Sequence, residues 1–290
     1  MNLVMCCNPL NKNTFHQDLR YPMLASLFFK RVYPNGQVFV GTTPGADIPE
    51  HFRRFFHVLE FDFTLNPFAL SRQLFYASFC DSEHLTDDTL FTGMDVVLGN
   101  KPFPELDPCK MMFTYRYHPS QPYCSDMVMV KKDAGAFASK FFLDMVKLIS
   151  FLPKKTRIFW ADQIAIVIEV GKLALNEFDG DTHRGPRYPD ILLAPGDTYL
   201  FTPNDFFTSI KRDDMTFTNV KKDVLNTDQL LRLMYSKYAI HFKGNRKNWF
   251  FALAYMAWRP AWITPFQYGS DMSVEQLFDG AFEEQERSAA

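Results

Sequence analysis

The chain is predicted to fold as an α/β protein with a mostly parallel central sheet flanked by helices. Three observations favour this class. Short apolar runs alternate with helix-spaced segments in the first part of the chain, an order typical of parallel strands joined by crossover helices. Hydrophobic residues make up 47% of the 290 residues, enough for a sizeable core. No apolar run reaches the ~18 residues that a membrane-spanning helix requires.

The first 79 residues predict three strands and three helices in alternation. Pro34-Asn35-Gly36 is typical of a turn and ends the first helix, in which Leu19, Met23 and Leu27 recur near helical spacing. Such alternation favours parallel strands, because each helix carries the chain back across the sheet. In chain order the expected elements are a strand at 3–7, a helix at 15–33, a strand at 37–41, a helix at 48–56, a strand at 58–63 and a helix at 69–79.

The rest of the domain is expected to continue the α/β pattern. The apolar run at 90–100 is predicted to be a strand that carries one carboxylate, Asp95. Burying an unpaired carboxylate is costly, so Asp95 is expected at the strand's carboxyl end, where open α/β sheets bind ligands. Further strands are expected at 111–117, 127–130, 191–193, 198–202 and 238–242, helices at 134–150, 162–175 and 227–235, and a loop at 178–190.

Two regions are expected in the domain organisation. Residues 1–249 form the α/β domain, and residues 250–290 form an aromatic extension with an acidic tail. Trp258, Trp262 and Phe266 in the extension could pack back on the domain or make a peripheral membrane contact through 250–268. Packing is favoured, because little positive charge accompanies these aromatic residues.

Charge and cysteine content exclude several classes of protein. The formal net charge of -2 lacks the basic excess of a nucleic-acid-binding protein, so no nucleic-acid partner is expected. The 5 cysteines fit no zinc or disulfide spacing, which favours reduced thiols in a cytoplasmic protein. The first residues contain no basic region, so no signal peptide is expected.

The run at 90–100 resembles the Asp-x-Asp strand of GT-A glycosyltransferases, in which an apolar run, two carboxylates, a second apolar run and a turn with Asn follow one another. In that family the carboxylates hold Mn or Mg, which bridges the diphosphate of a nucleotide-sugar donor. A cation there stabilises the negative charge that develops on the leaving nucleoside diphosphate. Gly93 occupies the first carboxylate position. The resemblance therefore implies that Asp95 is a metal ligand and that Met94 lies beside it in the donor site.

A second stretch, residues 241–249, resembles the His-x-x-Gly-x-x-Lys-Pro-Trp signature of the retaining glycogenin-type transferases and lipopolysaccharide galactosyltransferases. Asn248 replaces the Pro, and the matching residues are His241, Gly244, Lys247 and Trp249. The resemblance implies that His241 is a further metal ligand, which suits imidazole. It also implies that Gly244 admits close approach of the phosphates and that Lys247 contacts the diphosphate.

Three more segments fit the same family in chain order. The resemblance gives them roles at the donor phosphates, in the pocket for the sugar and acceptor, and at the donor sugar, where the candidate catalytic residues lie. In that order the residues are Arg72; Ser125 and Asp126; and Asp162 and Gln163. Helix capping explains Asp162 equally well. Cys7 and Asn8, after the first strand, are expected beside the base and ribose.

The implied function is transfer of a hexose from a nucleotide-diphosphate sugar, with UDP as the expected nucleotide. The acceptor is a hydroxyl of a glycan or a lipid-linked molecule, the anomeric configuration is retained, and Mn or Mg is the expected cofactor. Gly93 leaves two alternatives open. Lys243 and Arg246 could stabilise the diphosphate partly in place of the metal, or the chain could be a catalytically degenerate relative that binds nucleotide-sugar or a partner protein.

Two rival interpretations are weaker. A nucleotidyltransferase is disfavoured because no Gly-rich loop follows the first strand. The literal Asp-x-Asp of residues 179–183, which ends in a His, sits in a Gly/Pro-rich segment without an apolar strand before it. It is therefore interpreted as surface loop.

Overall fold

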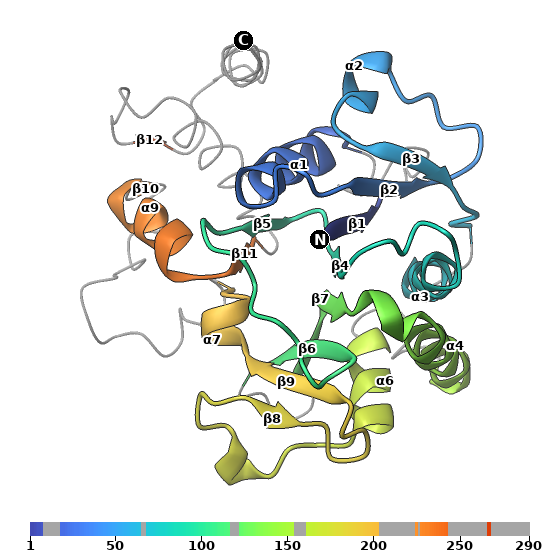
Figure 1. Cartoon of the computed structure of the whole chain (residues 1–290), viewed down its shortest axis with the longest axis vertical. Helices are drawn as coiled ribbons and strands as arrows, with labels where there is room; N and C mark the ends of the chain where they lie inside the picture. The colour runs from blue at the N-terminus through green and yellow to red at the C-terminus, as the bar shows by residue number, and fades with distance from the viewer. Residues whose placement is uncertain are drawn as a thin grey trace.

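The computed structural model describes residues 1–7, 18–64, 68–116, 122–153, 161–202, 224–225, 227–242 and 266–267. Its centre is an eight-stranded sheet in the order β3-β2-β1-β4-β7-β6-β9-β8. Helices cover both faces of this sheet, as Figure 1 shows. Within the described part of the chain, only β7 and β8 run against the other strands of the sheet. The predicted α/β fold with a mostly parallel sheet is therefore confirmed.

Four parallel strands form one half of the sheet: β1 (Asn2–Cys6), β2 (Val38–Thr42), β3 (His57–Glu60) and β4 (Thr89–Thr92). The helices between them are α1 (Arg20–Val32), α2 (Glu50–Arg53) and α3 (Phe68–Cys80). Every residue of β1, β2 and β4 is buried, as expected for short apolar strands covered on both faces. Pro22 lies in the first turn of α1, where its missing N–H removes no helical hydrogen bond.

The other half of the sheet contains β6 (Met111–Tyr115), β7 (Tyr123–Val130), β8 (His183–Arg184) and β9 (Ile191–Pro195). β7 runs antiparallel between β4 and β6, whereas β9 is parallel to β6. The amino end of β7 therefore lies at the same edge of the sheet as the carboxyl ends of β1, β4, β6 and β9. Open α/β sheets bind ligands at this edge.

A small second sheet extends from this edge. It joins β5 (Val96–Leu98) to β11 (Ala239–His241) in antiparallel pairing. Two helices, α7 (Gly196–Tyr199) and α9 (Thr227–Ser236), come before β11 in the chain. Another antiparallel pair joins β10 (Val224–Leu225) to β12 (Phe266–Gln267), so one dipeptide of the expected C-terminal extension pairs with residues 224–225.

The central sheet separates the buried side chains into two cores, one on each face, and helices cover both of them. α3, α4 (Gly135–Phe151) and α6 (Ala161–Val170) pack beside one another on one face (Figure 1). Their core includes the edge-to-face pair Phe79–Phe91, with ring centroids 5.6 Å apart. On the other face, α1 packs against β5 in the second core. Short 3-10 turns lie at Lys132–Ala134 (η2) and Leu175–Glu177 (η3).

Two strand predictions are wrong in ways that matter for the site. The run at 90–100 is two strands in two sheets, because a tight turn after Thr92, closed by the Val96 N–H to the Gly93 carbonyl (3.2 Å), separates β4 from β5. The strand expected at 198–202 is replaced by α7, which begins at Gly196 directly after β9, and only Phe201 forms an isolated bridge to β11.

Two other boundaries also differ. The helix expected at 162–175 ends at Val170, because Gly171 has φ +86° and such a left-handed residue ends a helix. The loop expected at 178–190 contains β8. The beginning of the helix expected at 15–33 lies outside the described residues, which resume at Asp18. None of the described helices has the length and apolar character to cross a membrane.

Candidate active site

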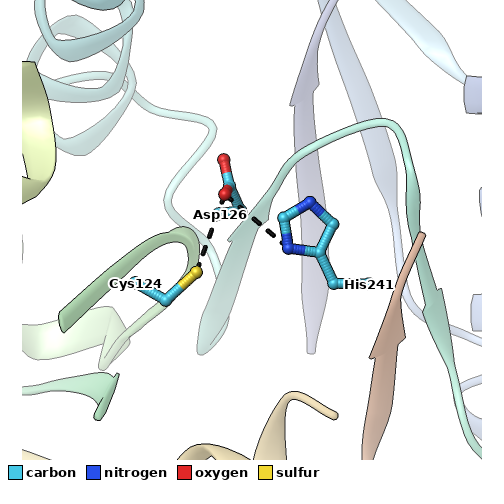
Figure 2. A group of neighbouring side chains, drawn as sticks. All are labelled: Cys124, Asp126 and His241. Carbon is cyan, nitrogen blue, oxygen red and sulfur yellow. Dashed lines mark hydrogen bonds and ion pairs between the residues drawn. The ribbon is translucent and has the colours of Figure 1, made fainter. Parts of the chain in front are cut away.

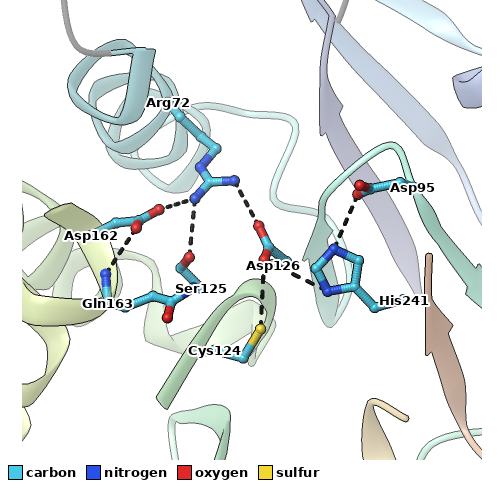
Figure 3. Close-up of polar contacts among 8 residues, drawn as sticks. All are labelled: Arg72, Asp95, Cys124, Ser125, Asp126, Asp162, Gln163 and His241. Carbon is cyan, nitrogen blue, oxygen red and sulfur yellow. Dashed lines mark hydrogen bonds and ion pairs between the residues drawn. The ribbon is translucent and has the colours of Figure 1, made fainter. Parts of the chain in front are cut away.

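Asp95 and His241, which the sequence predicts to share one site, meet at the carboxyl edge of the sheet. Asp95 lies in the turn after β4, and β11 runs beside β5 with His241 opposite Val96. This pairing brings Oδ1 of Asp95 to 3.3 Å from Nε2 of His241 (Figure 3). Both residues are buried. Two positions 146 residues apart in sequence therefore form one polar cluster.

Asp126 completes this cluster from the neighbouring strand. β7 pairs with β4 in a register that sets Met127 opposite Thr92, so Asp126 lies beside Gly93, whose N–H donates to the Asp126 carbonyl (3.0 Å). Oδ2 of Asp126 is 3.7 Å from Nδ1 of His241. The Cys124 thiol also points at this oxygen, with Sγ 3.6 Å away, as Figure 2 shows.

Arg72 connects the cluster to a third carboxylate. From α3, its guanidinium donates to Oδ1 of Asp126 (3.1 Å), to Oγ of Ser125 (3.1 Å) and to Oδ2 of Asp162 (Figure 3). Asp162 lies in the first turn of α6, and its Oδ1 accepts the backbone N–H of Gln163 (2.8 Å). Asp162 thus both stabilises the start of its helix and pairs with Arg72, so the two interpretations of this residue are compatible.

The charges in the cluster control its protonation. Burial lowers the pKa of His241, but the nearby Asp95 and Asp126 carboxylates outweigh this effect and raise the pKa to about 9. Burial likewise opposes the charge of Arg72, and Asp162 with its neighbours raises the pKa of this guanidinium well above its ordinary value. In the absence of a ligand, the cluster is therefore held together by two cations and three carboxylates.

Three buried side-chain atoms of the cluster lack a hydrogen-bond partner among the described residues: Nε of Arg72, Nδ1 of His241 and Oε1 of Gln163. Buried polar groups are normally satisfied, so such atoms indicate where a ligand or ion would bind. The resemblance of residues 90–100 to the Asp-x-Asp strand implies a divalent metal, and the residues present fit one. Carboxylate oxygens and imidazole suit Mn, Mg or Zn, and Cys124, Asp126 and His241 each offer a ligand atom within 4.8 Å of the others.

A cleft opens on the other side of Cys124. It lies at the ends of β6 and β9. The polar residues of its lining are Thr114, Arg116, Cys124, Asp197 and Thr202. Oγ1 of Thr114 is buried there without a hydrogen-bond partner among the described residues. The cleft therefore offers both donors and acceptors next to the cluster.

The remaining predicted donor residues are either buried or not described. Cys7 and Met94 are 0% and 1% exposed and belong to the core on the α1 side. Asn8, Gly244 and Lys247 lie outside the described residues. The rival Asp-x-Asp at 179–183 forms its own turn, in which His183 contacts Asp179 (2.9 Å) at the surface.

Sequence reasoning missed Cys124 and placed Asp126 only in the sugar and acceptor pocket. It began the strand at Met127, whereas β7 begins at Tyr123. The register of β6 and β7 also shifts, with Phe113 opposite Val128 and Thr114 opposite Cys124. A bulge of this kind re-aims side chains, and it turns Ser125 and Asp126 toward Arg72. The polar composition of residues 124–126 was the one visible signal.

Comparison with known proteins identifies the fold. No protein-family model matches the sequence, and no curated protein matches it either. Among solved structures, an active-site glutamine-to-glutamate mutant of LgtC matches with a TM-score of 0.52 and 11% identity over 98% of this chain and 96% of that chain. The apo form of the glycosyltransferase GlyE from Streptococcus pneumoniae TIGR4 matches with a TM-score of 0.50 and 9% identity over 98% of this chain and 63% of that chain.

A third match is galactosyltransferase LgtC in complex with donor and acceptor sugar analogues, with a TM-score of 0.49 and 12% identity over 98% of this chain and 96% of that chain. The matches to the LgtC mutant and to GlyE show that the chain has the GT-A fold of glycosyltransferases such as LgtC, and the resemblance expected from the sequence is confirmed at the level of the fold.

Proposed function

We propose that the chain is a glycosyltransferase that moves a hexose from a nucleotide-diphosphate sugar, with UDP as the expected nucleotide, to an acceptor hydroxyl. The observation that carries this proposal is the convergence of Asp95, Asp126 and His241 at the ligand-binding edge of a GT-A sheet. These residues belong to the site of a divalent cation, Mn or Mg in the fold family. When bound, that cation neutralises the charge that develops on the leaving diphosphate.

The residues around Arg72 would act on the donor. Its guanidinium is a permanent positive charge, and the carboxylates of Asp126 and Asp162 fix its direction. In that position it adds to the positive charge that the diphosphate meets, whether or not Lys247 contributes. Asp162 and Gln163 are the proposed catalytic residues beside the sugar, and the unpaired Oε1 of Gln163 is an acceptor for a sugar hydroxyl.

The acceptor would enter through the cleft beside Cys124. Its lining of hydroxyl and charged groups suits a glycan or the sugar of a lipid-linked molecule, which presents hydroxyls in many directions. Retention of configuration follows from the resemblance to the glycogenin-type transferases. We further propose a cytoplasmic protein in which residues 1–249 form the transferase domain and 250–290 pack on it. The five buried free thiols suit a reducing compartment.

Release of nucleoside diphosphate from a panel of UDP-, ADP- and GDP-sugars tests this function. The wild type is expected to release UDP, and Asp162→Asn and Gln163→Ala to lower kcat by roughly 100-fold or more, the range for a positioned polar catalytic group. Asp181→Asn, in the rival surface motif, is the matched control and should keep full activity. No turnover of any donor by the wild type, or an equal loss in the control, would contradict the proposal.

A second candidate is a nucleotide-sugar-binding protein without turnover. Gly93 favours it, because the first carboxylate of the Asp-x-Asp pattern is absent. Binding of UDP-sugar by the wild type without any release of UDP, at every metal tried, would support this candidate over the enzyme.

A further inference from the structure

The imidazole of His241 has two different surroundings. Its Nε2 faces Oδ1 of Asp95 at 3.3 Å, a distance at which the ring N–H can donate to the carboxylate. Its Nδ1 is buried and has no hydrogen-bond partner among the described residues. It faces Oδ2 of Asp126 and the thiol of Cys124 (Figure 2). A neutral imidazole that donates through one nitrogen presents a lone pair on the other, which is the form that binds metals.

The three atoms on the Nδ1 side lie within 4.8 Å of one another, and two of their separations match those of ligands around one ion. Oδ2 of Asp126 is 3.7 Å from Nδ1 of His241 and 3.6 Å from Sγ of Cys124. Ligands bound at about 2.0 to 2.3 Å around a tetrahedral ion lie roughly 3.3 to 3.8 Å from one another. Small side-chain shifts would therefore place one ion in contact with all three, without movement of the strands.

Both non-sulfur ligands are held by an outer partner. Asp95 orients the His241 ring through Nε2, as carboxylates do for metal-bound histidines. Arg72 holds the other oxygen of Asp126, Oδ1, at 3.1 Å. That contact leaves Oδ2 directed at His241 and Cys124. His241 and Asp126 are therefore each held in place by a neighbouring charged side chain, as the ligands of metal sites in proteins usually are.

The absence of a side chain at Gly93 leaves room for the carboxylates of Asp95 and Asp126. A Cβ at residue 93 would lie 2.8 Å from Oδ1 of Asp95 and 3.7 Å from Cβ of Asp126. A side chain on residue 93 would therefore crowd the Asp95 carboxylate and lie directly beside Asp126. Gly93 stands where the Asp-x-Asp pattern has its first carboxylate, and Asp126 brings an acidic side chain from the adjacent strand next to that position.

We propose that the cation of this site binds on Nδ1 of His241, Oδ2 of Asp126 and Sγ of Cys124, with Asp95 as a positioning residue rather than a ligand. The thiolate favours Zn²⁺ and similar transition ions over Mg²⁺. Three protein ligands leave a fourth position open, where a diphosphate oxygen of the donor would bind. The identity of that fourth ligand rests on the proposed function, whereas the ion site itself does not.

Titration of the full chain with Co²⁺ in the absence of donor tests the site. A thiolate ligand gives a sulfur-to-cobalt charge-transfer absorption, so the wild type should show this band and Zn²⁺ should remove it by competition. Cys124→Ser should lose the band and weaken cobalt binding, whereas Cys109→Ser, a second buried cysteine, should keep both. Asp95→Asn should keep the band and lower cobalt affinity by about 10- to 100-fold, the usual effect of weakening the carboxylate that orients a metal-bound histidine.

Cobalt binding without the band, or unchanged binding by Cys124→Ser, would overturn the proposal and favour a site made of oxygen and nitrogen ligands with Asp95 among them. The absence of stoichiometric cobalt binding by the wild type would also overturn it. If Cys124→Ser does not fold, Cys124→Ala takes its place in the same comparison with Cys109→Ser. A charge-transfer band in a protein that turns over no sugar donor would refute the transferase and leave the metal site intact.

Discussion

Replacing Arg72 with methionine is expected to destabilise the fold strongly, because it removes the cation that joins two buried carboxylates. Methionine keeps the apolar stem that packs within α3, so the change acts mainly on charge. The side chains of Arg72, Asp162 and Asp126 are 11%, 9% and 19% exposed, so solvent screens them little. Removing one partner of such a buried pair costs about 3 to 5 kcal/mol, since the remaining charge is left uncompensated.

The size of the effect is measurable by thermal unfolding. For a domain of this size each kcal/mol corresponds to about 2 to 4 °C, so Arg72→Met should lower Tm by roughly 6 to 20 °C. In Arg72→Met, Asp126 still faces His241 and Asp162 still accepts the Gln163 N–H. Because each carboxylate retains one partner, we expect a decrease in the lower half of that range.

A matched exposed pair supplies the control. Lys140, 74% exposed, pairs with Asp144 on the surface of α4, so solvent screens this pair and Lys140→Met should lower Tm far less than Arg72→Met. Differential scanning calorimetry of the two variants and the wild type, all without metal, gives the comparison. Equal small losses in both variants would refute the reasoning that a buried ion network holds the cluster.

Three further predictions concern the same region and its frame. In metal-free protein, the pKa of His241 is about 9, above its ordinary value of 6.5. The stabilisation that protonated His241 gives the fold is therefore complete below pH 6.5 and is lost as the pH rises through 9. In urea unfolding, the wild type should lose about 3 kcal/mol of stability over this range, and His241→Asn should show no such loss. Gly93→Ala forces the Asp95 carboxylate away from His241 and should lower cobalt affinity about 10-fold, as measured by competitive titration. Gly171→Ala, at φ +86°, should cost about 1 kcal/mol in the same unfolding assay.

The sequence was sufficient to predict the parallel strands and the meeting of Asp95 with His241. Short apolar runs between helical segments have few arrangements, and parallel strands bring their carboxyl ends to one edge. Asp95 follows β4 at that edge, and the antiparallel pairing of β11 with β5 sets His241 opposite Val96, beside Asp95. The resemblance of residues 241–249 to a known signature then related two segments that no local pattern connects.

The contacts of Asp126 could not be predicted in the same way. They depend on the register shift between β6 and β7 and on the antiparallel direction of β7, neither of which has a local sequence signal. Arg72 is 54 residues from Asp126 and 90 from Asp162, so its role as a bridge is purely tertiary. At 198–202 the alternation of apolar residues predicted a strand, but Gly196 and Asp197 after β9 start a helical turn instead.

The central claim, that this edge of the sheet binds the diphosphate of a nucleotide-sugar, is tested most directly by calorimetric titration of UDP into the metal-loaded and metal-free protein. The wild type is expected to bind UDP with a 1:1 stoichiometry, and to bind it more tightly when the metal is present. Asp126→Asn should lose that metal-dependent gain, and Asp181→Asn should retain it. No detectable UDP binding by the wild type in either state, or the same affinity in all three proteins with and without metal, would contradict the account.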